Sequence, residues 1–287
     1  MDGHAYAYRA FFAIRQLRSP SGAPVNAVFG FVKMLGRLLA WLNPTHRVVV
    51  WDGGLSEERL AALPDYKAQR PELPVELGEQ IGELEGYLPA AGVASVCLPG
   101  VEADDVIAGL AQRGAAAGLE VVVASSDKDF MQLVQPGIGL VNPGDKTARI
   151  WGTTEVRERT GVEPSQVVDW LALIGDSVDN IPGVPGVGPK TAAELLRRFG
   201  SVDGLYGRLS EVDSDRLRGA LAAAEDAVRR NCDLVRLRGE AANGVELEGL
   251  RARPSETGRL VELFRRWGFR SLLAEVEASA AAQAVLL

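Results

Sequence analysis

The sequence predicts an α/β fold in which a mainly parallel sheet carries helices on both faces and an α-helical region follows. Two observations support this prediction. Up to Trp151, short apolar runs alternate with amphipathic helical patterns, and such alternation is typical of parallel sheets. After Trp151, helical patterns enclose one Gly/Pro-rich loop and no clear strand. A chain of 287 residues is long enough for one or two globular domains.

The first elements along the chain are a helix, a strand and a segment interrupted by prolines. Apolar residues recur at every third or fourth position from Val25 to Leu42, which predicts a helix. The β-branched run that begins at Arg47 predicts a buried strand with Asp52 at its carboxyl end. Residues 55–74 contain several prolines, so one continuous helix is excluded and a protruding segment is expected.

The alternation of helix and strand then repeats before the chain becomes wholly helical. The next predicted elements are a helix over 75–91, a strand over 93–98, a helix over 103–117, a strand over 120–125 and a short helix from 128. Further helices are predicted over 154–160, 165–174, 190–199 and 215–237. We therefore expect an α/β domain over 1–151, a helical region over 152–277 and an Ala-rich tail over 278–287 that is frayed or disordered.

The composition excludes a membrane-spanning protein and some kinds of metal site. No stretch approaches the roughly 18 apolar residues of a membrane span, and no secretion signal is present, which predicts a cytoplasmic protein without a membrane partner. Two lone cysteines cannot supply a disulfide framework or a four-ligand zinc site, and two histidines cannot supply a histidine-rich metal site, so any metal is expected to be bound by oxygen. The net charge is −7. It does not argue against nucleic acid, because many of the acids fall in short clusters that are candidates for one site.

These acidic clusters follow predicted strands or open the helical region. In an open parallel sheet the carboxyl ends of the strands share one edge, so the clusters are expected to converge. Carboxylates this close repel one another unless divalent cations neutralise them, and oxygen ligands favour Mg²⁺ or Mn²⁺. Two ions about 4 Å apart would activate a water and stabilise the leaving oxygen of a phosphodiester. The candidate ligands are Asp2, Asp52, Glu102, Asp104, Asp105, Asp127, Asp129, Asp176 and Asp179.

Each acidic cluster taken alone also fits an ordinary helix cap or a solvated turn. The basic and Gly-rich motifs likewise allow more than one interpretation. The loop from Gly183 to Thr191 has the form of a helix–hairpin–helix turn that binds phosphates through backbone N–H groups, or else is a tight turn between helices. Residues 66–70, with Arg59 upstream, form a basic stretch that either contacts a phosphate or is a solvated face. Tyr8 and Arg9 are candidates to stack on a base and hold a phosphate.

With these motifs in order along the chain, the sequence closely resembles the 5′-nuclease domain of the bacterial DNA polymerase I family and its stand-alone flap endonuclease relatives. The resemblance covers nearly the whole chain. The stretches that carry it are Asp2 to Phe11, Tyr66-Lys-Ala-Gln-Arg70, Gly100 to Ile107, Ser126 to Leu133, Gly175 to Ala192 and Trp267 to Leu273.

The resemblance implies a PIN-like nuclease fold, a helical arch near 55–74 and a helix-three-turn-helix region. It implies that Asp2, Asp52, Glu102, Asp104, Asp105 and Asp127 hold one Mg²⁺, and that Asp127, Asp129, Asp176 and Asp179 hold a second, with Mn²⁺ as a substitute. It assigns catalytic roles to Lys67, Arg70 and Asp127, and a K⁺ ion to the hairpin turn at 183–191. The implied DNA contacts are Tyr8, Arg9, Tyr66, Lys67, Arg70, Gly186, Val187, Gly188, Lys190 and Thr191.

The function expected from this resemblance is 5′→3′ exonuclease and flap endonuclease activity on DNA flaps, nicks and free 5′ ends, for primer and flap removal. A DNA polymerase and a ligase are expected to act on the same intermediates, the protein is expected to be a monomer, and a bacterial nucleoid location is implied. Two alternatives remain open here: a catalytically weak DNA-binding fragment, and an RNA-acting nuclease of the PIN class. Because only Met1 precedes Asp2, the chain is also expected to lack an apolar first strand.

Overall fold

The fold was analysed in a computed structural model that describes residues 1–143 and 149–285. The chain forms two compact units. The first unit comprises residues 1–52, 72–98 and 244–287, and the second comprises 53–71 and 99–243. Each unit contains one pair of parallel strands, and most of the chain is helical, so the predicted α/β class is confirmed. Within the described residues, no helix combines the length and the apolar character that a bilayer crossing needs.

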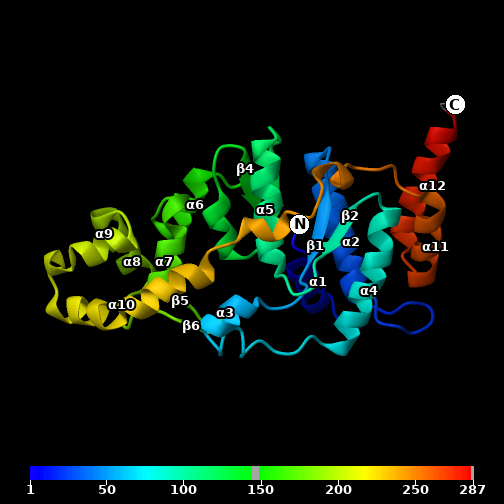
Figure 1. Cartoon of the computed structure of the whole chain (residues 1–287). Helices are drawn as coiled ribbons and strands as arrows, with labels where there is room; N and C mark the ends of the chain where they lie inside the picture. The colour runs from blue at the N-terminus through cyan, green and yellow to red at the C-terminus, as the bar shows by residue number, and fades with distance from the viewer. Residues whose placement is uncertain (144–148, 286–287) are drawn as a thin grey trace. The chain divides into compact units, whose positions relative to one another are not determined.

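The parallel strands of the first unit are β1 (Val48–Trp51) and β2 (Ala94–Cys97). The start of the chain extends this pairing, because Asp2 forms a parallel bridge with Val50 and the Met1 amino group donates to the Val48 carbonyl at 2.9 Å. The helices of this unit are α1 (Gly3–Ala13), α2 (Asn26–Leu42), α4 (Val75–Ala90), α11 (Thr257–Trp267) and α12 (Arg270–Val285). Figure 1 shows α11 beside α4, and α12 packs on α11.

The core of the first unit is aromatic. The Trp51 ring at the end of β1 stacks on Phe31 of α2 and lies edge-on to His4 of α1. It also fits against Gly3, where a Cβ atom would come within 2.5 Å of the ring. A second aromatic group joins α4 to the end of α11, with Tyr87, Phe264 and Trp267 packed against one another. These contacts hold the chain's C-terminal helices on its N-terminal elements.

The second unit contains β3 (Val121–Ala124) and β4 (Ile138–Val141), which pair in parallel. Helix α5 (Ala103–Ala116) precedes β3, and the 3₁₀ helix η1 (Lys128–Leu133) follows it. A two-residue antiparallel pair, β5 (Gly175–Asp176) and β6 (Ile181–Pro182), lies between α7 and α8. The α-helices of this unit are α3 (Glu57–Ala62), α5, α6 (Thr153–Thr160), α7 (Val167–Ile174), α8 (Pro189–Phe199), α9 (Val202–Gly207) and α10 (Asp215–Val235). Its other 3₁₀ helices are η2 (Pro164–Gln166), η3 (Leu209–Glu211) and η4 (Gly239–Ala242), while η5 (Leu247–Leu250) falls in the first unit.

Several elements differ from those predicted. The segment after Lys128 is a 3₁₀ helix. Strand β4 was not predicted because Gly139 interrupts its apolar run, and the pair β5–β6 was not predicted because two residues show no periodicity. Helix α12 continues to Val285 through the tail that was expected to be frayed. The four parallel strands form two separate pairs. Strands β1 and β2 belong to the first unit, and strands β3 and β4 belong to the second. The division into domains at 151/152 stays a prediction, since the compact units follow other boundaries.

Packing between α5 and η4 gives the first testable prediction. A Cβ at Gly109 would lie 2.0 Å from the Gly239 carbonyl oxygen and 2.7 Å from the Ala242 Cβ. Gly109→Ala should therefore lower the free energy of unfolding by about 1–3 kcal/mol, because this contact cannot absorb another methyl group. Gly219→Ala is the matched control on α10, where a Cβ meets open space, and should stabilise by up to about 1 kcal/mol. Thermal unfolding of both variants checks the contrast, and an unchanged melting temperature for Gly109→Ala would contradict it.

Candidate active site

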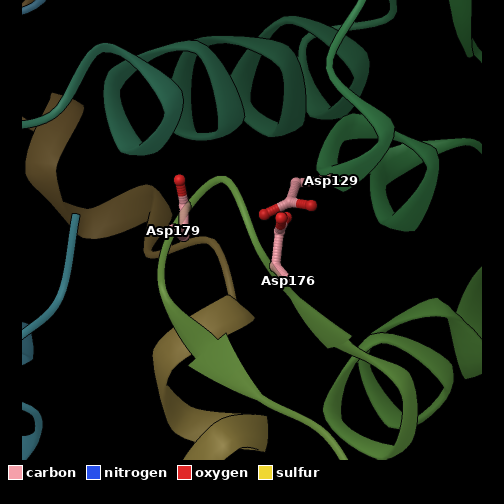
Figure 2. Close-up of side chains that lie close together, drawn as sticks. All are labelled: Asp129, Asp176 and Asp179. Carbon is pink, nitrogen blue, oxygen red and sulfur yellow. The ribbon is translucent and has the colours of Figure 1, made fainter. Parts of the chain in front are cut away.

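Three carboxylates of the second unit lie together. One oxygen each of Asp129, Asp176 and Asp179 falls within a group whose members are all within 4.8 Å of one another (Figure 2). Asp129 belongs to η1, Asp176 ends β5, and Asp179 lies in the turn that leads to β6. All three side chains are buried, with exposed fractions of 9%, 6% and 8%. This group is a candidate metal centre, as predicted from the acidic clusters.

Local backbone geometry fixes these side chains. Asp127 caps η1, because its Oδ1 accepts a hydrogen bond from the Asp129 N–H at 2.9 Å. Asp176 makes a similar turn by accepting from the Val178 N–H at 2.9 Å. The short β5–β6 pairing then returns the chain so that Asp179 faces the same space. Asp and Asn side chains commonly hold turns in this way, which explains why short clusters of acids can be rigid.

The electrostatics of this group favour a bound cation. Burial, together with the charges of Asp127 and Asp104, holds the pKa of Asp129 well above its usual range. The buried Oδ1 of Asp129 has no hydrogen-bond partner among the described residues. The Lys128 ammonium lies 3.2 Å from an Asp176 oxygen. Buried carboxylate oxygens with one left unpaired are the ligand set that a hard divalent cation prefers, so these residues fit a metal ion.

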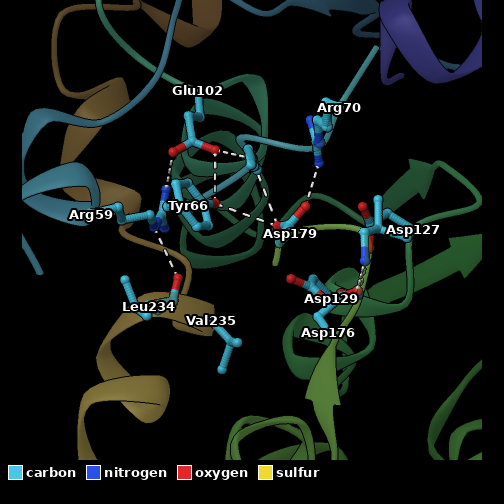
Figure 3. Close-up of polar contacts among 12 residues, drawn as sticks. Arg59, Tyr66, Arg70, Glu102, Asp127, Asp129, Asp176, Asp179, Leu234 and Val235 are labelled. Carbon is cyan, nitrogen blue, oxygen red and sulfur yellow. Dashed lines mark hydrogen bonds and ion pairs between the residues drawn. The ribbon is translucent and has the colours of Figure 1, made fainter. Parts of the chain in front are cut away.

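A second group of acids is compensated by basic side chains of the 53–71 segment (Figure 3). Glu102, which is 1% exposed, accepts hydrogen bonds from the Arg59 guanidinium at 2.9 Å and the Tyr66 hydroxyl at 3.2 Å, and it also pairs with the Lys67 ammonium. Burial alone would raise the pKa of Glu102, but Lys67 and Arg59 outweigh it and leave that pKa below its usual range. Glu102 is therefore ionised and fully paired.

Lys67 and Arg70, basic residues of the predicted arch, also contact the candidate metal centre. The Arg70 guanidinium donates to Asp179 at 2.6 Å, and the Lys67 ammonium lies 3.8 Å from the other Asp179 oxygen. Lys67 is only 5% exposed and has a left-handed backbone, with φ +57°, held by its N–H donating to the Asp179 carbonyl. Burial opposes the charge of Lys67, but Asp179 and Glu102 raise its pKa overall. Lys67 thus links the two groups of acids.

Arg59 is a residue whose role the sequence did not reveal. It was placed in a basic surface stretch, yet it is 2% exposed. Its guanidinium donates to both oxygens of Asp105 at 2.8 and 2.9 Å, to Glu102, and to the carbonyls of Leu234 and Arg236. These contacts join α3 to the start of α5 and the end of α10. The signal available in the sequence was the apolar run that follows Arg59 directly, from Leu60 to Leu63, which is an unusual place for a solvated charge.

The other predicted ligands of the second unit differ in how they are engaged. Both oxygens of Asp105 accept from Arg59, and its Oδ1 also accepts from the Arg238 N–H at 2.8 Å. Asp105 therefore has the contacts of a structural residue, and its role as a metal ligand stays a prediction. Asp104 and Asp127 are half-buried and lie at the starts of α5 and η1. Asp104 and Asp127 both act on the pKa of Asp129, which places them near the candidate metal centre.

Asp2 and Asp52 belong to the first unit. Asp2 is 7% exposed and caps α1 by accepting from the Ala5 N–H at 2.9 Å, so the chain's start is held in place. Asp52 follows β1 as predicted, and its buried Oδ1 has no hydrogen-bond partner among the described residues. Tyr8 of α1 is half-exposed and stacks on Phe12, and Arg9 is exposed. Their parts in metal or DNA binding stay predictions.

The predicted hairpin turn connects β6 to α8. Gly186 has φ +84°, and Gly186 and Gly188 face open space, whereas a Cβ at Gly183 would meet the Ile174 carbonyl at 2.2 Å. Pro189 begins α8, and Lys190 is exposed beside it. Val187 is 7% exposed, so it could offer a ligand only its backbone. Tyr66, a further predicted DNA contact, is 3% exposed and uses its hydroxyl on Glu102 and Asp179, which leaves little ring surface for a base.

Buried carboxylates beside lysine and arginine define a candidate centre for metal-assisted hydrolysis of phosphodiesters. Comparison with known proteins agrees with this class. Residues 1–161 match the family model of the 5′-3′ exonuclease N-terminal resolvase-like domain, and residues 162–258 match that of the 5′-3′ exonuclease C-terminal SAM fold. The chain belongs to the 5′-3′ exonuclease family.

Individual relatives give the same result. A 5′-3′ exonuclease of Aquifex aeolicus (strain VF5) is 36% identical over 96% of this chain and 94% of its own length. DNA polymerase I of Bacillus caldotenax is 37% identical over 96% of this chain, which spans 32% of that polymerase. The chain thus spans about a third of the DNA polymerase I it matches. A structure of the T5 flap endonuclease with DNA and metal ions shares the fold, with a TM-score of 0.68, 23% identity and 96% coverage of both chains.

The Arg59 contacts lead to a prediction about stability. Arg59→Met should lower the free energy of unfolding by about 3–5 kcal/mol, because it leaves the buried Asp105 without its charged partner and removes one of the two charged partners of Glu102. The matched control is Arg229→Gln, whose guanidinium also contacts two carboxylates but is 46% exposed, and it should cost less than about 1 kcal/mol. Urea unfolding measures both. Equal costs for the two variants would show that Arg59 is not a buried link.

The unpaired Asp129 oxygen leads to a prediction about metal. In EDTA, Asp129→Asn should raise the free energy of unfolding by about 1 kcal/mol, since it removes a buried charge that lacks a partner. With Mg²⁺ or Mn²⁺ present, the rise in melting temperature seen for the wild-type chain should be smaller in this variant. Asp213→Asn, at a side chain 89% exposed, is the control. A metal-dependent rise that is the same in both variants would remove Asp129 from the metal centre.

Proposed function

We propose that this protein is a Mg²⁺-dependent 5′→3′ exonuclease and flap endonuclease that hydrolyses DNA phosphodiesters at flaps, nicks and free 5′ ends. The observation that carries the proposal is the buried group of Asp129, Asp176 and Asp179 with its unpaired oxygen, in a chain of the 5′-3′ exonuclease family. The Aquifex relative, nearly all of whose length is matched, bears the name 5′-3′ exonuclease.

Asp129, Asp176 and Asp179 would hold one ion, and Asp127 is the acid we expect to be shared with a second. Bound Mg²⁺, or Mn²⁺ in its place, supplies a water of lowered pKa and neutralises charge on the phosphate. The chain's own part is to keep these carboxylates rigid and close together. The turn hydrogen bonds from Asp129 and Val178 to Asp127 and Asp176 serve this purpose.

Lys67 and Arg70 are proposed to contact the scissile phosphate. Both bases now pair with acids of the site, so a phosphate group would compete with Asp179 and Glu102 for them. A cation bound by these acids would compete with Lys67 and Arg70 for the carboxylates and so release the two bases. Substrate and metal binding would therefore strengthen each other. The metal ion would replace Lys67 and Arg70 at the acids, and the phosphate would then pair with these two bases.

Duplex DNA is proposed to bind at the turn over 183–191. Gly186 and Gly188 leave open space for a phosphate to approach the backbone, and Lys190 adds a positive charge. A K⁺ ion at this turn, a DNA polymerase and a ligase as partners, a monomeric state and a cytoplasmic, nucleoid-associated location are further parts of the proposal. They rest on the family alone.

The deciding experiment is cleavage of a labelled double-flap DNA by the full chain, with Mg²⁺ and with EDTA. Asp127→Asn should lower the cleavage rate by several orders of magnitude while DNA binding is kept or becomes tighter, because a negative charge near the phosphate is removed. Asp213→Asn is the control for loss of an exposed acid. Binding without Mg²⁺-dependent cleavage by the wild-type chain would favour a DNA-binding module, and preferential cutting of an RNA flap would favour an RNA-acting enzyme.

Lys67 and Lys190 should affect different steps. Lys67→Ala should lower the single-turnover cleavage rate by about 100-fold or more with a smaller change in affinity, because Lys67 lies among the acids of the site. Lys190→Ala should weaken DNA binding equally for all sequences and reduce its salt dependence by about one unit of slope. Lys33→Ala, at a lysine that pairs with Glu275, is the control. Interchanged effects of the first two variants would refute this division.

A further inference from the structure

A cavity of about 460 Å³ lies in the first unit, and none of its lining residues is assigned to the proposed nuclease site. Its walls come from the end of α2, the residue that precedes β1, the end of α4 and the segment that leads into α11. Strand β1 runs from Val48 to Trp51, so the cavity lies at its amino end and Asp52 at its carboxyl end. The residues on which the argument depends are Leu39, Arg47, Tyr87, Arg253, Ser255 and Leu260.

The cavity is positively charged. Arg47 and Arg253 line it, and no acidic side chain does. The Arg47 guanidinium donates to the carbonyls of Gly92 at 3.0 Å and Arg253 at 2.5 Å. Carbonyl oxygens satisfy its hydrogen bonds without neutralising its charge. Within the described part of the chain, no ion pair of the Arg253 side chain is recorded. Two cations with no compensating carboxylate in the wall attract an anion.

The wall that carries Arg253 is held in place by backbone hydrogen bonds. The N–H groups of Ala252, Arg253 and Glu256 donate to the carbonyls of Thr45, Gly92 and Ala90 at 2.9, 3.2 and 2.8 Å. Gly92 has φ +68°, and a Cβ there would come within 2.0 Å of the Arg253 carbonyl oxygen. This close approach requires glycine. A site whose walls are already ordered loses little conformational entropy when a ligand binds.

The remaining lining suits an organic body attached to the anion. Leu39 and the small exposed parts of Leu260 and the Tyr87 ring supply apolar surface, and Ser255 and the Tyr87 hydroxyl supply hydrogen-bonding groups. Burial raises the pKa of Tyr87 to about 12 against the opposing effect of Arg47, so its phenol remains a donor at neutral pH. The volume lies within the roughly 300–1,000 Å³ of small-molecule sites. A phosphate on the arginines with an apolar, partly polar body beside it is the chemistry of a mononucleotide.

We propose that this cavity binds a mononucleotide, with its phosphate between Arg47 and Arg253 and its base or sugar against Leu39, Tyr87 and Leu260. The phosphates of duplex DNA lie on a convex surface, which suits an open groove better than a small pocket with polar and apolar walls. The inference is independent of the proposed nuclease activity, because it uses none of the residues assigned to that activity.

The test is calorimetric titration of the full wild-type chain with deoxycytidine monophosphate in EDTA and low salt. We expect saturable binding with a Kd below about 1 mM. Arg253→Gln should weaken it at least about tenfold, because a charge-assisted hydrogen bond is lost. Tyr87→Phe, which keeps the ring packing against Phe264 and Trp267, should weaken it less. Arg265→Gln removes the same charge from α11 outside the cavity and should leave the affinity unchanged.

The ligand's parts are separated by competition. Inorganic phosphate should displace the nucleotide, and deoxycytidine without its phosphate should bind at least about tenfold more weakly. Arg253 holds the fold through its backbone, and its side chain is exposed, so its variant is expected to keep the wild-type melting temperature. Absence of saturable binding, or an equal loss in Arg253→Gln and Arg265→Gln, would overturn the proposal. Displacement by a flapless DNA duplex that depends on Arg253 would assign the cavity to the DNA backbone instead.

Discussion

The organisation of the second unit depends on how its buried carboxylates are compensated. Glu102 and Asp105 are at most 4% exposed and are paired by Arg59, with Lys67 as a further partner of Glu102. Asp129 is buried, and within the described residues it has no ion pair and keeps one oxygen without a hydrogen-bond partner. An uncompensated buried charge is costly, and a fold tolerates it only where something else supplies the opposite charge. Glu102 and Asp105, which Arg59 of α3 neutralises, therefore help to hold the unit together. Asp129, which Arg59 does not contact, is available to bind a cation.

Arg59 and Lys67, two of the three basic residues of the 53–71 segment, differ in how they pair with these acids. Arg59 is buried, always charged, and contacts five acceptors in a fixed planar arrangement, so it acts as a permanent link. Lys67 is a single charge on a flexible stem that pairs with Glu102 and Asp179 together. In the proposed function it would leave one acid for a phosphate. A permanent partner keeps Glu102 in position even when the exchangeable partner moves.

Much of this could be predicted from the sequence. The strands that end at Asp52 and precede Asp127, the helix that starts beside Glu102 and the Gly-rich turn before α8 follow from local patterns, and the structure has them close to the predicted bounds. The compensation could not be predicted, because it depends on contacts between distant residues. Arg59 meets the Leu234 carbonyl across 175 positions, and Asp105 meets the Arg238 N–H across 133. A basic residue near acids looks the same in a sequence whether it is solvated or buried.

The same reasoning explains why the net charge of −7 says little about what the protein binds. A phosphate group can be held in two ways, through a cation bound between carboxylates or directly by arginine. The second unit has the residues for the first way, with Asp129, Asp176 and Asp179 gathered around one space. The first unit has the residues for the second way, with Arg47 and Arg253 lining a cavity that contains no acid. The charged side chains that the fold gathers at each site therefore matter more for binding than the net charge of the chain. A chain with a negative net charge can have one acidic and one basic site, both of which bind phosphate groups.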